Sequence, residues 1–152
     1  MRSFHRNSPE AAARIVALVL ICDGHVCRSE LDALERLRIE HALKLDPGGF
    51  SRVVHLLCED LLVSAYASDA MTGRVDAATL VALLAEIDDP ALQRRVLALA
   101  EAAAGADHHL SDAEAMLLRT ARQQWRIGVD EVPSFEHGRL PVRQTGLAST
   151  RA

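Results

Sequence analysis

The sequence predicts a single all-α domain of about six helices. Leu, Ala and Val dominate the composition and aromatic residues make up only 3% of the chain, whereas strands are usually rich in aromatic and β-branched residues. Apolar residues recur at helical spacing in most segments, and one short acidic motif occurs twice. A chain of 152 residues can bury a sufficient core in one domain without disulfides or a metal.

The first predicted helix covers residues 9–22. Ser8 can cap its N-terminus, and Pro9 suits its first position. The segment is apolar nearly all round after Arg14, so we expect it to lie at the centre of the fold. Gly24 can adopt the left-handed backbone conformation that is common just beyond a helix end.

Two further helices are predicted in the first half of the chain. The second covers residues 27–45, and a Pro-Gly-Gly turn separates it from the third, which covers residues 50–67. Apolar residues three or four positions apart give each helix one buried face. We expect Cys58 to be a packed thiol beside that face. The residues expected to face inward are Leu31, Leu34, Leu37, His41, Ala42, Leu45, Phe50, Val53, Val54, Leu56, Leu57, Leu61, Leu62 and Ala65.

Three more helices are predicted in the second half. Asp76 and Asp89 can cap the fourth and fifth helices, while Ser111 and Glu114 have the spacing of a capping box for the sixth. These helices are expected at residues 77–87, 90–104 and 112–126. The inward residues expected on the sixth helix are Met116, Leu117, Ala121 and Trp125.

The helical period is lost after residue 126. Residues 8–126 therefore form the predicted helical domain, and residues 127–152 form a C-terminal tail interrupted by several Gly and Pro. We expect this tail to be irregular, or to be ordered by its own domain or by a neighbouring molecule. In the latter case the chain would be a homodimer.

An acidic motif at the end of the first helix, residues 23–30, returns at residues 107–114. Each copy lies between two apolar helical segments. We therefore interpret the motif as a helix-turn-helix junction that occurs twice in the chain. The matching pairs, all 84 positions apart, are Asp23 and Asp107, Val26 and Leu110, Cys27 and Ser111, and Glu30 and Glu114.

This doubled junction, on an all-helical chain of this size, resembles the TerB family of tellurite-resistance proteins. The resemblance covers about residues 9–126. His108 departs from the family pattern, which has Gly at that position, and the tail after residue 126 has no counterpart. The residues that match the two acidic turns of the family are Asp23, Gly24, Val26 and Glu30, and then Asp107, Leu110 and Glu114.

The resemblance implies a compact helical domain with an internal repeat and a role in tellurite or broader chemical-stress resistance. It also implies that the acidic turns bind a divalent metal ion. Because domains of this family occur fused to other modules, it further implies a scaffold or sensor rather than a catalyst.

Physical reasoning gives the metal hypothesis a candidate ligand set: Asp23, Glu30, Asp107 and Glu114. If the two junctions face each other, four carboxylates meet and repel, and a hard divalent cation relieves that repulsion. The neighbouring His25, His108 and His109 would favour zinc or a transition metal instead. The identity of the ion is therefore open.

A purely structural interpretation competes with the metal. Asp23 can accept backbone N–H bonds in its turn, and Glu30 and Glu114 can act as capping-box acids. The chain would then be a non-catalytic protein-interaction or scaffold domain. A zinc site at Cys22, His25 and Cys27 has only three local ligands, and the loop lacks the oxygen donors of an EF-hand.

Other functional classes find less support in the sequence. The net charge of −4 disfavours a nucleic-acid surface. We find no phosphate-binding Gly-rich loop, nucleophile elbow or His-Glu-x-x-His motif, so we expect no enzymatic activity. Three Cys without framework spacing favour a reducing, cytoplasmic setting, and no apolar run reaches the length of a membrane span.

Overall fold

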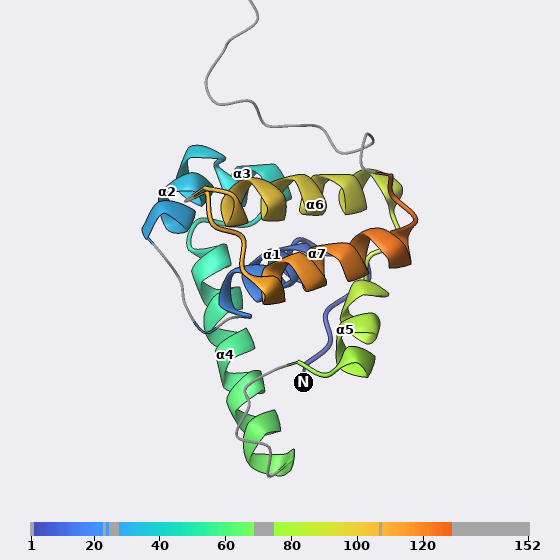
Figure 1. Ribbon diagram of the computed structural model, residues 1–152. Helices are drawn as coiled ribbons and strands as arrows, with labels where there is room; N and C mark the ends of the chain where they lie inside the picture. The colour runs from blue at the N-terminus through green and yellow to red at the C-terminus, as the bar shows by residue number, and fades with distance from the viewer. Residues whose placement is uncertain (1, 23, 25–27, 69–74, 107, 129–152) are drawn as a thin grey trace, which may run out of the picture.

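The computed structural model describes residues 2–22, 24, 28–68, 75–106 and 108–128 (Figure 1). This part of the chain is entirely helical apart from its connections, with no strand, which confirms the predicted all-α class. The helices are α1 (Pro9–Ile21), α2 (Arg28–Arg36), α3 (Ile39–Leu43), α4 (Gly49–Ser68), α5 (Ala77–Leu84), α6 (Pro90–Ala104) and α7 (Asp112–Trp125).

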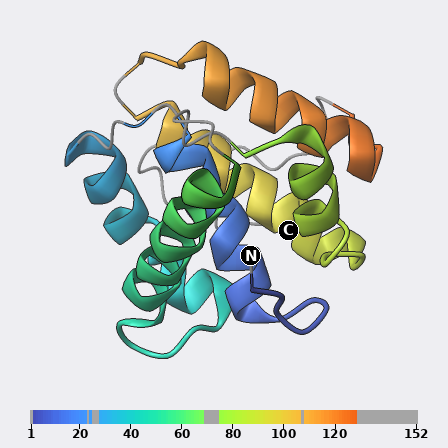
Figure 2. The ribbon, with the colours of Figure 1, turned by 90° about the horizontal axis from the view of Figure 1, so that it is seen from below.

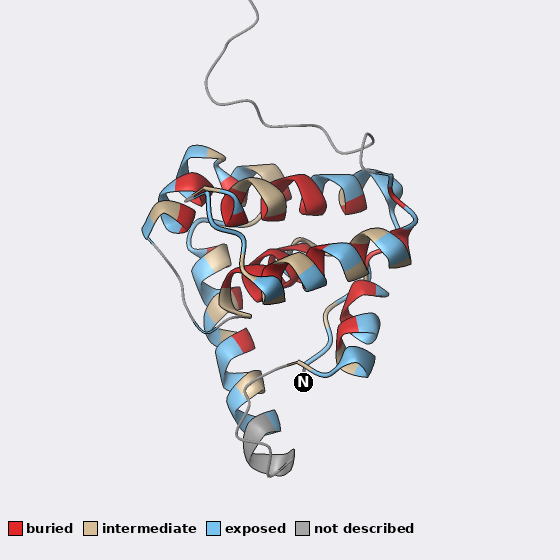
Figure 3. Cartoon of the chain, viewed as in Figure 1, coloured by how far each residue is buried: buried red, intermediate tan, exposed pale blue. Residues whose placement is uncertain are grey.

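Helix α1 lies at the centre of the domain, as predicted (Figures 1 and 3). Every residue from 11 to 20 is buried, because α4, α6 and α7 all pack against this helix. The Ser8 hydroxyl caps it by accepting the Ala11 N–H at 3.1 Å, and Pro9 occupies its first turn. A helix covered on all sides has to be apolar nearly all round, and Arg14 is the one charged residue among the ten that are buried here.

The two halves of the chain pack across each other. Helix α6 lies along α1, and α2, which follows α1, packs on α6. Helix α7, which follows α6, packs on both α6 and α1. The central pair therefore contains the first helix of each predicted repeat, and the second helices cover it from outside.

The remaining predicted caps are present. The Asp76 carboxylate accepts the Thr79 N–H at 2.9 Å and begins α5. The Asp89 carboxylate accepts the Ala91 N–H at 2.9 Å and, with Pro90 next to it, begins α6. Among the described residues, no helix combines the length and apolar character that crossing a membrane requires.

The single helix predicted for residues 27–45 is wrong, because the chain bends after Arg36. Arg38 has a left-handed backbone, with φ of 50°, and its N–H bonds to the Glu35 carbonyl at 3.0 Å. The bend lets α2 pack on α6 while α3 packs on α1 and α4. One straight helix could not contact all three neighbours.

Five side chains that we expected to be buried or packed are exposed instead. Leu31 is 48% exposed, and Leu62 and Met116 are each 60% exposed; His41 and Cys58 are exposed as well. Helix α4 extends beyond the other helices (Figure 1), so its outer end has few neighbours to pack against. Helix α5 is also shorter than predicted, because residues 85–87 continue as a tighter turn.

Candidate functional site

The two acidic junctions lie at the same end of the domain. Figures 1 and 2 both place the end of α1 and the start of α2 near the connection from α6 to α7. The packing of α2 on α6 holds the second helix of the first junction beside the first helix of the second. The fold therefore brings the described elements that flank the two junctions to the same end of the domain.

The described parts of the two junctions have the same backbone geometry. Gly24 has φ of 79° and donates its N–H to the Ile21 carbonyl at 3.0 Å. His108 has φ of 61° and donates its N–H to the Gly105 carbonyl at 3.2 Å. Because both bonded pairs match at an offset of 84, His108 occupies the same left-handed position as Gly24.

This position requires a backbone conformation rather than a small side chain. A Cβ atom placed on Gly24 would meet nothing within 4 Å. Glycine adopts positive φ without steric cost, whereas an L-residue in the left-handed region costs roughly 1–2 kcal/mol. His108 carries that cost in the second junction.

Glu114 closes the start of α7 in the predicted capping box. Its carboxylate accepts the Ser111 N–H at 2.8 Å, and its own N–H donates to the Ser111 hydroxyl at 3.2 Å. The side chain is only 2% exposed. Glu114 therefore supports the fold, whatever else it binds.

Glu30 has the matching place in the first junction. It is the third residue of α2, as Glu114 is the third residue of α7, and it is 5% exposed. Burying a carboxylate costs free energy unless hydrogen bonds or a cation compensate. Two buried glutamates, Glu30 and Glu114, therefore lie at the starts of α2 and α7. Their burial is the observation most relevant to the metal hypothesis.

The other two predicted ligands, Asp23 and Asp107, lie outside the described residues. The four-carboxylate site therefore remains a prediction. Within the ranges that the structure describes, no three His, Cys, Asp or Glu side chains gather closely enough to hold an ion. A site at this end would have to include at least one residue beyond those ranges.

The histidine and cysteine alternatives are only partly described. His108 and His109 are exposed beside the second junction, while His25 and Cys27 lie outside the described residues. Cys22 is half-buried, and its thiol donates to the Val19 carbonyl at 3.0 Å. This bond turns the Cys22 sulfur back along α1.

A buried ion pair in the middle of α1, formed by Arg14, was not predicted from the sequence. Arg14 is 1% exposed; its guanidinium donates to the Glu86 carboxylate and to the Arg2 carbonyl and stacks on the Phe4 ring at 4.7 Å. A cation inside an otherwise apolar helical run was the available signal. Its partner, 72 positions away, could not be identified from helical spacing.

The N-terminal arm, residues 2–8, covers this buried pair. The Asn7 side-chain carbonyl accepts the Asp88 and Asp89 N–H groups at 2.9 and 3.0 Å, and Arg6 pairs with Asp88 at 2.8 Å. The bond from the Asn7 amide, followed by that from Arg6, lowers the pKa of the Asp88 carboxyl below its ordinary value of 3.8. The arm is thus tied to the connection between α5 and α6.

No protein-family model, curated protein or solved structure matches this chain significantly. The likeness to TerB proteins therefore depends on the doubled motif itself.

Proposed function

We propose that this chain is a non-catalytic module of the TerB type, active in tellurite or wider chemical-stress resistance, that binds a divalent cation at its two acidic junctions. One observation carries the cation part of the proposal. Glu30 and Glu114 are both buried at matching positions, next to turns of matching backbone geometry.

The chemistry of these donors suits a hard divalent ion. Calcium, magnesium and manganese bind carboxylate and carbonyl oxygens. The Glu114 carboxylate already accepts the Ser111 N–H, but an ionised carboxylate has about four acceptor sites and can bind an ion as well. Asp23 and Asp107 would complete the set, and the ion would neutralise their mutual repulsion.

A second candidate function is a protein-interaction domain in which the acidic turns only fix helix geometry. The capping box of Ser111 and Glu114 supports it, since it accounts for one buried carboxylate without any ion. In this case the doubled junction sets the angle between helices, and function depends on another surface.

Thermal unfolding in the presence of calcium, magnesium, manganese or zinc separates the two candidates. An ion at a hundredfold excess over its Kd stabilises the folded state by about 2.7 kcal/mol, which raises the Tm of a domain of this size by roughly 5–10 °C. We expect one of the four ions to give such a shift. Replacing Asp23→Asn together with Glu30→Gln should abolish it.

The matched control is Asp32→Asn, which removes an exposed acid on α2 outside the junction. It should leave the ion-dependent shift unchanged. If no ion changes the Tm of the wild-type chain, the cation proposal is wrong and the structural alternative stands. The same holds if the double variant retains the full shift.

A further inference from the structure

We infer that residues 139–143 in the tail of one copy of this chain dock in a surface groove of a second copy. The groove lies between α2, α3 and α4 and has a volume of about 670 Å³. We call it the α2–α4 groove. The residues that matter here are Leu31, Glu35, Ile39, Glu40, Leu45 and Phe50.

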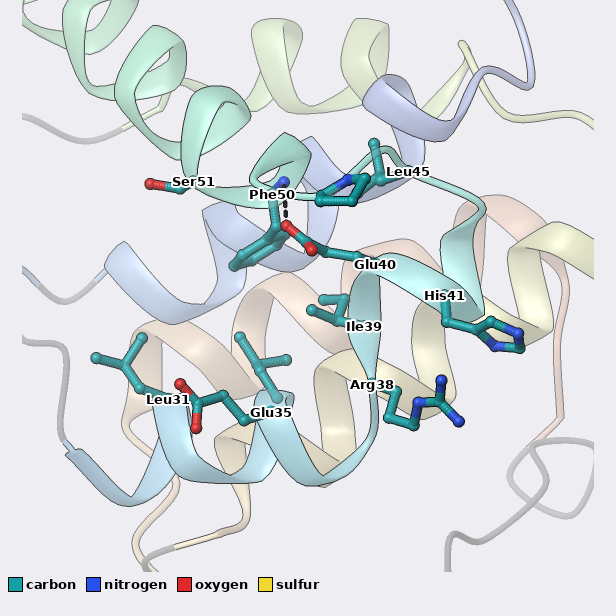
Figure 4. Close-up of a pocket in the computed structure, with 11 residues that line it drawn as sticks. Leu31, Glu35, Arg38, Ile39, Glu40, His41, Leu45, Phe50 and Ser51 are labelled. Atoms are coloured by element: carbon teal, nitrogen blue, oxygen red, sulfur yellow. Dashed lines mark hydrogen bonds between the residues drawn. The ribbon is translucent and has the colours of Figure 1, made fainter.

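The α2–α4 groove combines an apolar floor with acidic edges. Figure 4 shows the Leu31, Ile39 and Phe50 side chains around the hollow, with the Glu35 and Glu40 carboxylates close by. Within the part of the chain that the structure describes, neither carboxylate forms an ion pair.

The basic side chains that also line the groove do not pair with these acids. Arg38 and His41 point away from Glu35 and Glu40 in Figure 4. Leu31, on the floor, is 48% exposed, which leaves apolar surface without a partner. A complementary occupant would bring apolar side chains flanked by positive charge.

The tail of this chain contains such a segment at residues 139–143, with the sequence Arg-Leu-Pro-Val-Arg. Pro141 disfavours a helix and pushes the residue before it toward an extended backbone. In an extended segment Leu140 and Val142 share one side, and Arg139 and Arg143 start from the other side at each end. Their long, flexible side chains can bend past the backbone toward the acidic edges of the groove. The rest of the tail is less suitable, since residues 130–136 carry three acids that Glu35 and Glu40 would repel.

The length of the tail indicates that the segment in the groove comes from a second copy. Figures 1 and 2 place the end of α7 and helix α2 on opposite sides of the domain. Residues 129–138, ten in number, separate Gly128 from Arg139 and span at most about 36 Å when fully extended. A folded domain of this size is itself roughly 36 Å across, and the tail would have to run around it.

In a pair of copies, both tails can dock at the same time. If each tail enters the groove of the other copy, the assembly closes as a dimer and leaves no groove open. The interface then consists of one apolar pair and two arginines per groove, so its affinity should depend on salt.

The test is the oligomeric state of the full chain, measured by sedimentation over a range of protein concentrations. We expect the wild-type chain to dimerise. Reversing both tail charges, Arg139→Glu with Arg143→Glu, should weaken dimerisation about tenfold or more. Glu35→Arg together with Glu40→Arg should do the same from the groove side, and combining all four changes should restore the dimer, because every charge across the interface is then exchanged.

Arg151→Glu serves as the matched control, because it reverses a tail charge outside the docking segment and should leave the dimer intact. Restoration by the combined variant excludes misfolding as the cause of the losses. A dimer that survives the tail reversals overturns the inference, since another surface must then hold it. A monomeric wild-type chain also overturns it, and protection of Arg139 and Arg143 from trypsin would then show docking within one copy.

Discussion

The first and second halves of this domain form junctions with the same described backbone geometry but differ in several side chains. At one matching position Gly24 and His108 share a left-handed turn. At another, the centre of α1 carries the buried Arg14 where α6 carries the buried Ala98, again 84 positions later. At a third, both halves have a buried Glu, Glu30 and Glu114. The repeat is therefore stricter in backbone geometry and in its acids than in its core residues.

Comparing the halves identifies the features that the doubled junction requires. A residue with positive φ and a glutamate at the third position of the following helix occur in both junctions. We infer that both features are needed to form the junction. The ion pair of Arg14 does not recur, because it serves the N-terminal arm, which the second half lacks. Three sets of substitutions test whether the two halves differ in this way.

The largest effect should come from the feature that only the first half contains. Glu86→Ala leaves the Arg14 cation buried without its carboxylate, and removing one partner of such a pair costs about 3 kcal/mol or more. We place this pair near the lower end, since the Glu86 side chain keeps 18% exposure. Urea unfolding measures the loss in the free energy of unfolding.

The control for that loss replaces the cation as well. In Arg14→Met with Glu86→Ala, no buried charge remains, so much of the lost stability should return. An equally large loss in the double variant would show that packing of the long side chains, rather than the charge, stabilises the middle of α1.

An intermediate effect should come from the feature that both halves share. Glu114→Ala removes the acceptor of the Ser111 N–H and should lower the free energy of unfolding by about 1–2 kcal/mol. Glu114→Gln keeps a capping acceptor and should cost less. If Glu30→Ala and Glu30→Gln give the same pair of values in urea unfolding, the two junctions use their acids alike. Unequal values would show that the likeness stops at the backbone.

The smallest effects should come from exchanging the two left-handed residues. His108→Gly should stabilise the domain by about 1 kcal/mol, because it removes the conformational cost at φ of 61°. Gly24→His should destabilise it by a similar amount, since nothing crowds a side chain there. In the exchange of both residues the changes should cancel, as measured by Tm. A larger loss at Gly24 would reveal a contact that the second junction lacks.

Local signals in the sequence predicted most element boundaries correctly. Ser8, Asp76, Asp89 and Ser111 each cap the helix that they were expected to cap. A cap acts on backbone groups two or three residues away, so its whole mechanism is present in a short window of sequence. The same holds for the capping-box role of Glu114.

Features that depend on distant segments could not be predicted in this way. The bend at Arg38 has no Gly or Pro to announce it and exists because α2 and α3 pack on different neighbours. Met116 and Leu62 fit the apolar pattern of their helices, but periodicity does not say how far the covering helices extend. Half of the candidate site, Asp23 and Asp107, lies outside the described residues, so it remains a prediction from the motif alone.

The burial of α1 affects how the chain folds during its synthesis on the ribosome. Its ten consecutive buried residues are shielded by helices that continue to residue 125. A ribosome adding about 5–20 residues per second needs roughly 5–20 seconds more to finish that shield. During this interval the apolar α1 has only part of its cover, since α4 is made before α6 and α7, and chaperones that bind exposed apolar segments could bind it.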